Sequence, residues 1–324
     1  MNRSYQASGA RHPYRDAVPD DLVKPLNFDA RYGAGLDRGL VLGGGGVFQI
    51  AWQTGYLATV AEAGIDLRQA DRIVGTSAGS LVGAVFAARR IAVLGLVADL
   101  LARASSVVSF LAPVGDLSPS QQHALDMMMT AENADPETIK AIGHAAMAAA
   151  TPSARTMRRN VAVLVDYAWW PSKRLWVTAV DALTAERVAI TKQTGVRPTT
   201  AVAASCALPG LYAPQLIQDR RCMDGGLSGS GTNSDLVGGA RRAVVLSLAP
   251  GDRPLDRPMA AATTHHMLGE MAALRDSGTE VFHRWAPLRP DLDMMSPDTM
   301  GEGLAAGRAQ AADDTDELRE FWGA

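Results

Sequence analysis

Short apolar runs alternate with longer helical patterns along most of this 324-residue chain. The run GLVLG at residues 39–43 precedes a helical pattern over residues 47–63, and the run RIVG at residues 72–75 precedes another over residues 78–89. Further apolar runs follow at residues 175–181, 188–191 and 243–249. Such alternation is typical of parallel strands that are connected by helices. The chain is therefore predicted to have an α/β fold, a three-layer α/β/α domain with a mostly parallel central sheet.

The strand signal disappears between residues 91 and 167, where the pattern becomes helical. Ser118-Pro119 and Asp135-Pro136 each combine an N-cap residue with a proline at the first helical position, so they predict the starts of two helices. We interpret residues 91–167 as a helical insertion over the sheet. Its three consecutive methionines, Met127 to Met129, are typical of core packing, although flexible thioethers also suit a surface that adapts to apolar ligands.

The two ends of the chain differ in character. Residues 1–37 are polar and show neither strand nor helix periodicity, so we expect a flexible N-terminal extension. Residues 38–324 are expected to form one domain that ends in helical patterns over residues 259–283 and 302–321. The chain has no apolar leader and no stretch of about 18 apolar residues, so neither a signal peptide nor a membrane span is expected.

Composition excludes several classes of protein. With 47% hydrophobic and 20% charged residues, the chain has enough apolar material for a large core. Its net charge is −3 and no basic cluster occurs, so we do not expect nucleic acid as a partner. Cys206 and Cys222 have no metal-ligand spacing and are too few for a disulfide framework. We therefore expect free thiols in a reducing cytoplasm, and neither a metal nor another cofactor.

The strongest local motif is GTSAG at residues 75–79, directly after one apolar run and directly before a helical pattern. In this strand, turn and helix context, a serine flanked by glycines occupies a tight, strained turn. The glycines are needed because a Cβ at either position would collide with the neighbouring chain. The motif predicts that Ser77 presents its Oγ at a helix N-terminus as a nucleophile.

A second motif, the four glycines at residues 43–46, lies between the first predicted strand and its helix. Consecutive glycines let backbone N–H groups converge on an anion, and a helix N-terminus adds a favourable dipole. The turn can hold a phosphate or a developing oxyanion, and the residues alone leave both open. It is no P-loop, because no Lys-Ser/Thr pair follows, and Gln49 replaces the third glycine of a dinucleotide fingerprint.

A third motif is Asp224, which ends a short apolar run and is followed by two glycines. Such an aspartate is often only a turn residue, and it gains meaning from the other two motifs. In the order GGGG, GTSAGS and DGG, the three motifs resemble the patatin-like phospholipase family, over about residues 40–249. The resemblance extends to four further stretches, at residues 50–55, 177–181, 204–210 and 231–235.

The resemblance implies a patatin-like fold and a catalytic dyad. Ser77 would be the nucleophile and Asp224 the base, while the oxyanion hole would comprise the amides of Gly44, Gly45 and Gly46. A carboxylate with the usual pKa of about 3.9 is a weak base toward a serine hydroxyl. Asp224 must therefore be desolvated and bonded directly to the Ser77 Oγ.

The implied activity is hydrolysis of carboxylic esters of lipids, of the phospholipase A or lysophospholipase type, in lipid catabolism. A lipid ester as substrate also implies peripheral contact with a membrane surface. Phe48 and Gln49 depart from the family, which commonly has a basic residue and then glycine at these positions. This departure leaves open a catalytically weak member of the same fold that binds a lipid or a protein.

An α/β-hydrolase esterase with a Ser-Asp-His triad is the other alternative. Its chain order is allowed, because His265, His266 and His283 all follow Asp224. We nevertheless expect surface or packing roles for these histidines, because they lie in regular runs without loop signals around them. The sequence carries no signal for an oligomeric state.

Overall fold

The computed structural model describes Val23, Leu26 and residues 31–103, 116–248, 258–289 and 292–323, with only the backbone for residues 100–103 and 258–266. The predicted flexible extension, residues 1–37, lies outside the described residues except for Val23, Leu26 and residues 31–37.

An eight-stranded sheet in the order β5-β6-β3-β2-β1-β7-β8, with β4 paired to β3, forms the centre of the molecule. The strands are β1 (Arg38–Leu42), β2 (Arg72–Gly75), β3 (Leu175–Asp181), β4 (Arg187–Ile190), β5 (Gln215–Ile217), β6 (Arg220–Asp224), β7 (Arg242–Leu248) and β8 (Glu280–Ala286). β1 pairs in parallel with β2 and β7. β2 also pairs in parallel with β3, and β7 pairs in parallel with β8. β4 and β6 pair antiparallel with β3, and β5 pairs antiparallel with β6. The predicted mostly parallel central sheet is confirmed.

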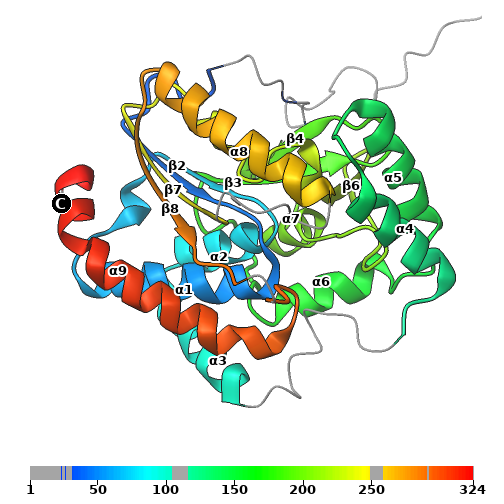
Figure 1. Ribbon diagram of the computed structural model, residues 1–324, viewed down its shortest axis with the longest axis horizontal. Coiled ribbons are helices and arrows are strands. Elements are labelled where there is room, and N and C mark those ends of the chain that lie inside the picture. The colour runs from blue at the N-terminus through cyan, green and yellow to red at the C-terminus, as the bar shows by residue number, and fades with distance from the viewer. Residues whose placement is uncertain are drawn as a thin grey trace, which may run out of the picture.

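Helices cover both faces of this sheet (Figure 1). α1 (Gly46–Glu62), α2 (Ala78–Ala87), α7 (Pro198–Ser205) and α9 (Met300–Trp322) lie on one side, and α8 (Pro258–Asp276) lies on the other. Side chains of β1 alternate accordingly. Leu40 and Leu42 join a buried cluster with Trp52, whereas Val41 joins one with Met271. Successive side chains of a strand point to opposite faces of the sheet, so β1 packs against helices on both faces. The sheet is thus the middle one of three layers.

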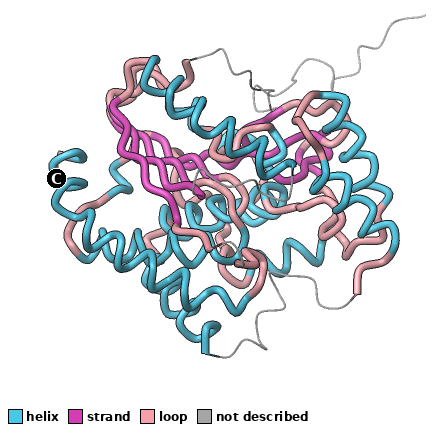
Figure 2. The backbone as a smooth tube through the Cα atoms, viewed as in Figure 1, coloured by secondary structure: helices cyan, strands magenta, loops and turns pink. Residues whose placement is uncertain are grey.

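Between α2 and β3, the described residues form helices and loops but no strand. The helices are α3 (Ile91–Arg103), α4 (Pro119–Thr130), α5 (Pro136–Ala148) and α6 (Ala154–Ala162) (Figure 2). α4 and α5 pack against β3 and β6. Both predicted N-caps are confirmed. The Ser118 Oγ accepts a hydrogen bond from the backbone N–H of Gln121 at 3.4 Å, and the Asp135 Oδ1 accepts one from the backbone N–H of Thr138 at 2.9 Å.

The methionine run on α4 packs inward. Met128 is buried, and the partly buried Met127 and Met129 join the same apolar cluster, which includes Val180 of β3 and Met223 of β6. This packing agrees with core filling rather than with an exposed adaptive surface.

α9 approaches α1 closely enough to require glycines. A Cβ on Gly307 would stand 2.1 Å from the Trp52 carbonyl oxygen, and one on Gly55 would stand 2.4 Å from that of Leu304. Both distances are far below van der Waals contact, so the two helix backbones lie directly against each other. α9 thereby fixes α1, the helix that begins in the glycine turn.

The prediction for the C-terminal segment was partly wrong. The helix predicted over residues 259–283 ends at Asp276 as α8, and Glu280–Ala286 is instead the edge strand β8. Gly278, at φ +87°, lies in the turn between helix and strand. β8 lacks clear alternation because an edge strand is only partly covered, so the sequence pattern missed it. The helix predicted over residues 302–321 is confirmed as α9.

Candidate active site

The glycine turn and the GTSAG turn follow adjacent parallel strands. β1 and β2 pair in register from Gly39 with Arg72 to Leu42 with Gly75, so both chains leave the sheet at the same edge. In α/β sheets this carboxyl edge is where ligands bind. The site therefore forms where the two strongest sequence motifs meet.

The GTSAG turn has the strained geometry that its glycines predict. Ser77 has φ 50° and ψ −121°, a conformation that non-glycine residues rarely adopt. Gly79 allows the turn to contact β1, because a Cβ there would lie 2.0 Å from the Leu42 carbonyl oxygen. Gly75 is equally crowded, since its Cβ would lie 2.7 Å from the Gly79 carbonyl oxygen. The turn holds Ser77 immediately before the first residue of α2.

Ser77 donates a hydrogen bond from its Oγ directly to the Asp224 Oδ2 at 2.7 Å. The other carboxylate oxygen, Oδ1, accepts the Gly226 amide at 2.9 Å. Asp224 ends β6, and β3 lies between β6 and β2, so the sheet brings together residues 147 positions apart. Gly225 permits this approach, because a Cβ on it would stand 2.5 Å from the Thr178 Oγ1.

Burial raises the pKa of the Asp224 carboxyl to about 6, against the opposing effect of hydrogen bonds from Gly226 and Ser77. The side chain is nearly sealed from solvent, with 2% of the residue exposed. Desolvation disfavours the charged form, so the carboxylate holds a proton more strongly than a surface aspartate does. With this pKa the carboxyl group remains mostly ionised at neutral pH.

The backbone of Ser77 is also fixed by neighbours on α7 and α2. Its N–H donates to the Ser205 Oγ at 2.8 Å, and its carbonyl accepts the Ser80 hydroxyl at 2.7 Å and the Cys206 thiol at 3.2 Å. Burial raises the pKa of Cys206 to about 12, so this thiol is neutral and is no competing nucleophile. Sequence reasoning noted the ASCALPG stretch but missed the contact of Ser205 with the nucleophile.

The glycine turn lies beside Ser77. A Cβ on Gly44 would stand 3.3 Å from the Ser77 Cβ and 4.0 Å from its Oγ. The Gly44 N–H donates to the Gly231 carbonyl at 3.3 Å. No acceptor in the described part of the chain takes the amides of Gly45 and Gly46, which adopt φ +144° and +66°. These two amides are free to receive an anion at the start of α1.

Phe48 and Gln49 are both fully buried in the first turns of α1. The Phe48 N–H donates to the Met294 carbonyl at 3.1 Å, and its ring lies 3.2 Å from where a Cβ of Gly303 would stand. The Gln49 side-chain amide has no hydrogen-bond partner among the described residues. The departure from the family pattern thus replaces a charged position by an apolar contact with α9.

The histidines take no part in this constellation as far as it is described. His283, on β8, places its Nε2 2.8 Å from the Ser247 Oγ, and burial lowers its pKa to about 4. The side chains of His265 and His266 lie outside the described residues. Cys206 and Cys222 are free cysteines, as expected.

The described residues hold neither a candidate metal site nor a candidate membrane span. They contain no group of three or more His, Cys, Asp or Glu side chains arranged to hold a metal ion. None of their helices is both long and apolar enough to cross a membrane.

Replacing Gly79 by alanine is expected to disrupt the nucleophile turn, because the new methyl group would overlap the Leu42 carbonyl and neither backbone can move freely. We expect a loss of about 2–3 kcal/mol in the free energy of unfolding, measured by urea denaturation. Gly83→Ala in the same helix is the control, since its Cβ would meet only side chains at 3.4 Å or more. Equal stability of the two variants would contradict the packing described.

The chain is similar to a known protein family and, at low sequence identity, to solved structures. A sequence model of the family "Patatin-like phospholipase" matches residues 40–233, well over half of the chain. Similar solved structures include VipD from Legionella pneumophila, at 12% identity and a TM-score of 0.40 over 87% of this chain and 67% of that one. The type III effector ExoU follows, at 17% identity and a TM-score of 0.36 over 88% of this chain.

The chain spans about half the length of ExoU, covering 54% of it. No curated protein shows significant sequence similarity. The match over residues 40–233 contains the glycine turn, the GTSAG turn and Asp224 in order, on a mostly parallel sheet covered by helices. By this match, the chain belongs to the patatin-like phospholipase family.

Proposed function

We propose that this protein hydrolyses carboxylic esters of lipids through a Ser77–Asp224 dyad. The observation that carries the proposal is the direct 2.7 Å hydrogen bond from the Ser77 Oγ to a buried carboxylate. A serine hydroxyl needs a base within hydrogen-bond reach, and Asp224 is the titratable group that meets this condition. Its pKa of about 6 makes it a stronger base than an exposed aspartate.

The acylation step uses the bond already present. Asp224 accepts the proton of the Ser77 Oγ while the oxygen attacks the ester carbonyl. The resulting oxyanion is stabilised by backbone amides of the glycine turn, with Gly45 and Gly46 as unoccupied donors and Gly44 beside the nucleophile. As the tetrahedral intermediate collapses, Asp224 passes its proton to the leaving alcohol and Ser77 retains the acyl group.

The deacylation step repeats the same transfers with water. Asp224, ionised again, takes a proton from a water molecule that attacks the acyl-enzyme carbonyl. Collapse returns this proton to the Ser77 Oγ and releases the carboxylic acid. One carboxylate thus serves both half-reactions, with no imidazole between it and the serine.

Phospholipids, lysophospholipids and acylglycerols are the proposed substrates, in keeping with the family. Phe48 contributes no positive charge near the oxyanion turn, which favours substrates that are bound by their acyl chain rather than by an anionic group. We extend the proposal to a cytoplasmic protein that contacts lipid surfaces peripherally. The free cysteines Cys206 and Cys222 support a reducing compartment.

The direct Ser77–Asp224 contact argues against a Ser-Asp-His triad. In a triad the imidazole lies between serine and carboxylate, whereas here the Asp224 Oδ2 accepts from the Ser77 Oγ itself. The His283 Nε2 lies at hydrogen-bond distance from Ser247, and its lowered pKa makes it a poor base at neutral pH.

Fluorophosphonate labelling tests the dyad, because this reagent modifies only an activated serine. We expect labelling of the wild type, its complete loss in Ser77→Ala, and a decrease of at least about 100-fold in the labelling rate of Asp224→Asn, which cannot accept the proton. A variant with His265, His266 and His283 all replaced by alanine should still be labelled. Loss of labelling in this variant as well as in Ser77→Ala would favour the triad, and an unlabelled wild type would favour a binding protein.

The pH dependence of hydrolysis gives a second test. The base must be ionised, so kcat/KM for a soluble p-nitrophenyl ester should be constant above the Asp224 pKa and fall tenfold per pH unit below it. The midpoint should lie at about 6, because burial raises the pKa of Asp224 to that value. An acid limb with its midpoint near 4 would mean that the base is solvated, contrary to the burial described.

A further inference from the structure

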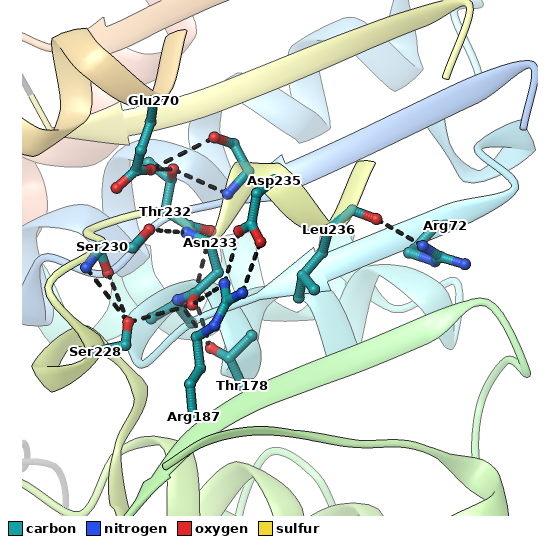
Figure 3. Close-up of polar contacts among 12 residues, drawn as sticks. Arg72, Thr178, Arg187, Ser228, Ser230, Thr232, Asn233, Asp235, Leu236 and Glu270 are labelled. Carbon is teal, nitrogen blue, oxygen red and sulfur yellow. Dashed lines mark hydrogen bonds and ion pairs between the residues drawn. The ribbon is translucent and has the colours of Figure 1, made fainter. Parts of the chain in front are cut away.

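The segment after Asp224 forms a buried polar network beside the active site (Figure 3). It runs from Ser228, at the end of the 3-10 helix η4 (Gly225–Ser228), into η5 (Ser234–Val237). Ser230, Thr232, Asn233 and Ser234 are at most 1% exposed. Buried polar side chains are costly unless they are hydrogen-bonded, so their partners decide what the segment does.

One set of partners belongs to the nucleophile turn. The Asn233 Nδ2 donates to the Oγ1 of Thr76, the residue before Ser77, at 3.0 Å, and to the Thr178 Oγ1 at 3.4 Å. The two threonine hydroxyls are 2.8 Å apart. The segment therefore holds the residue that precedes the nucleophile.

A second partner belongs to the glycine turn. The Gly231 carbonyl accepts the Gly44 N–H at 3.3 Å. This bond fixes the first peptide of the turn, and the next two amides are the ones without an acceptor in the described chain. One segment thus touches both the oxyanion turn and the nucleophile turn.

The segment is anchored at its C-terminal end by an ion pair. Arg187 of β4 donates to both carboxylate oxygens of Asp235 at 2.6 Å, and to the Asn233 Oδ1 at 3.1 Å. The Asn233 backbone N–H donates to the Ser230 Oγ at 2.6 Å. These bonds hold Asn233 in a backbone conformation with a positive φ of 54°.

At Thr232 the anchor is Glu270 of α8, the helix that covers the face of the sheet opposite α1 and α2. Its Oε2 accepts a short hydrogen bond from the Thr232 hydroxyl and a second one from the Ser234 hydroxyl at 3.4 Å. Thr232 connects this anchor to the nucleophile turn, since its carbonyl accepts from the Thr76 Oγ1 at 3.5 Å. Gly231, the acceptor of the Gly44 amide, is the preceding residue.

Glu270 is a buried acid that the proposed dyad does not use. Burial raises its pKa to about 7, and the nearby Asp235 carboxylate adds to this effect, while hydrogen bonds from Ser230 and Thr232 and the charge of Arg187 oppose it. Its Oε1 is buried without a hydrogen-bond partner in the part of the chain that the structure describes. Such a group costs stability, which the bonds to the segment offset only in part.

We propose that Glu270 is a positioning residue, which holds residues 230–234 so that Gly231 and Asn233 align the oxyanion turn with the nucleophile turn. The proposal rests on the proposed function for its effect on catalysis, but its structural part stands alone. The alternative is that Glu270 merely attaches α8 to the sheet.

Hydrogen–deuterium exchange tests the structural part without reference to activity. In Glu270→Leu we expect faster exchange, by at least about tenfold, in peptides covering residues 43–48 and 75–80. Met271→Ala is the matched control. Met271 is the next residue of α8 and is buried against Val41 and Val245, so its truncation loosens the same helix without touching the hydroxyl groups. Unchanged exchange in Glu270→Leu, or an equal increase in Met271→Ala, would overturn the proposal.

Catalysis tests the consequence. Per fluorophosphonate-labelled serine, kcat of Glu270→Leu and of Thr232→Val should fall about tenfold with KM within twofold, and the double variant should lose no more than either single one. Glu270→Gln should retain kcat, because its amide carbonyl still accepts the Thr232 hydroxyl, and Met271→Ala should also retain it. Equal loss in Glu270→Gln and Glu270→Leu would overturn the positioning role. If the wild type has no hydrolase activity, the proposed function fails. The hydrogen–deuterium exchange experiment alone then decides whether Glu270 positions the two turns.

Discussion

The strained conformation of Ser77 is the constraint on which the site depends. A non-glycine residue at positive φ costs about 1–3 kcal/mol, and it persists only where its surroundings determine it. Here the surroundings act on both peptide groups of Ser77, through Ser205 on one side and Ser80 with Cys206 on the other. Each hydrogen bond contributes about 0.5–1.5 kcal/mol, so three are enough to offset the strain.

The same constraint explains the close packing around the turn. Because Gly79 touches the Leu42 carbonyl, α2 starts against the end of β1, and the glycine turn after β1 must pass beside Ser77. α1 then begins in that turn and is fixed by α9 through Gly55 and Gly307. Dense interiors transmit such constraints because side chains and backbones have few alternative positions. The C-terminal helix thus contributes to the active site without supplying a residue to it.

Local signals explain what the sequence could predict. The strands before the two glycine motifs, the N-caps at Ser118 and Asp135, and the approximate bounds of α1 and α2 depend on neighbours within a few residues, so pattern alone finds them. The bond from Ser77 to Asp224 joins residues 147 positions apart. It was expected only because the family resemblance supplied a partner that spacing could not.

The contacts that sequence reasoning missed are long-range as well. Ser205 lies 128 positions from Ser77, and Glu270 lies 38 positions from Thr232. A serine near the end of a helix or a glutamate within a helix gives no signal of what it contacts, because both residue types are most often exposed. Strand β8 was missed for a related reason, since an edge strand is determined by its pairing with β7 more than by its own pattern.

The carboxyl groups of Asp224 and Glu270 are both shielded from solvent, but they differ in their hydrogen-bond partners. Asp224 has hydrogen-bond donors on both oxygens, the Ser77 hydroxyl and the Gly226 amide, and no cation is among the causes of its pKa shift. A cation would lower its pKa and weaken it as a base. Glu270 has the higher pKa, about 7, but its Oε2 accepts from Thr232 and Ser234 rather than from Ser77, an arrangement that suits attachment rather than proton transfer. The hydrogen-bond partners thus separate the proposed base from the proposed positioning residue.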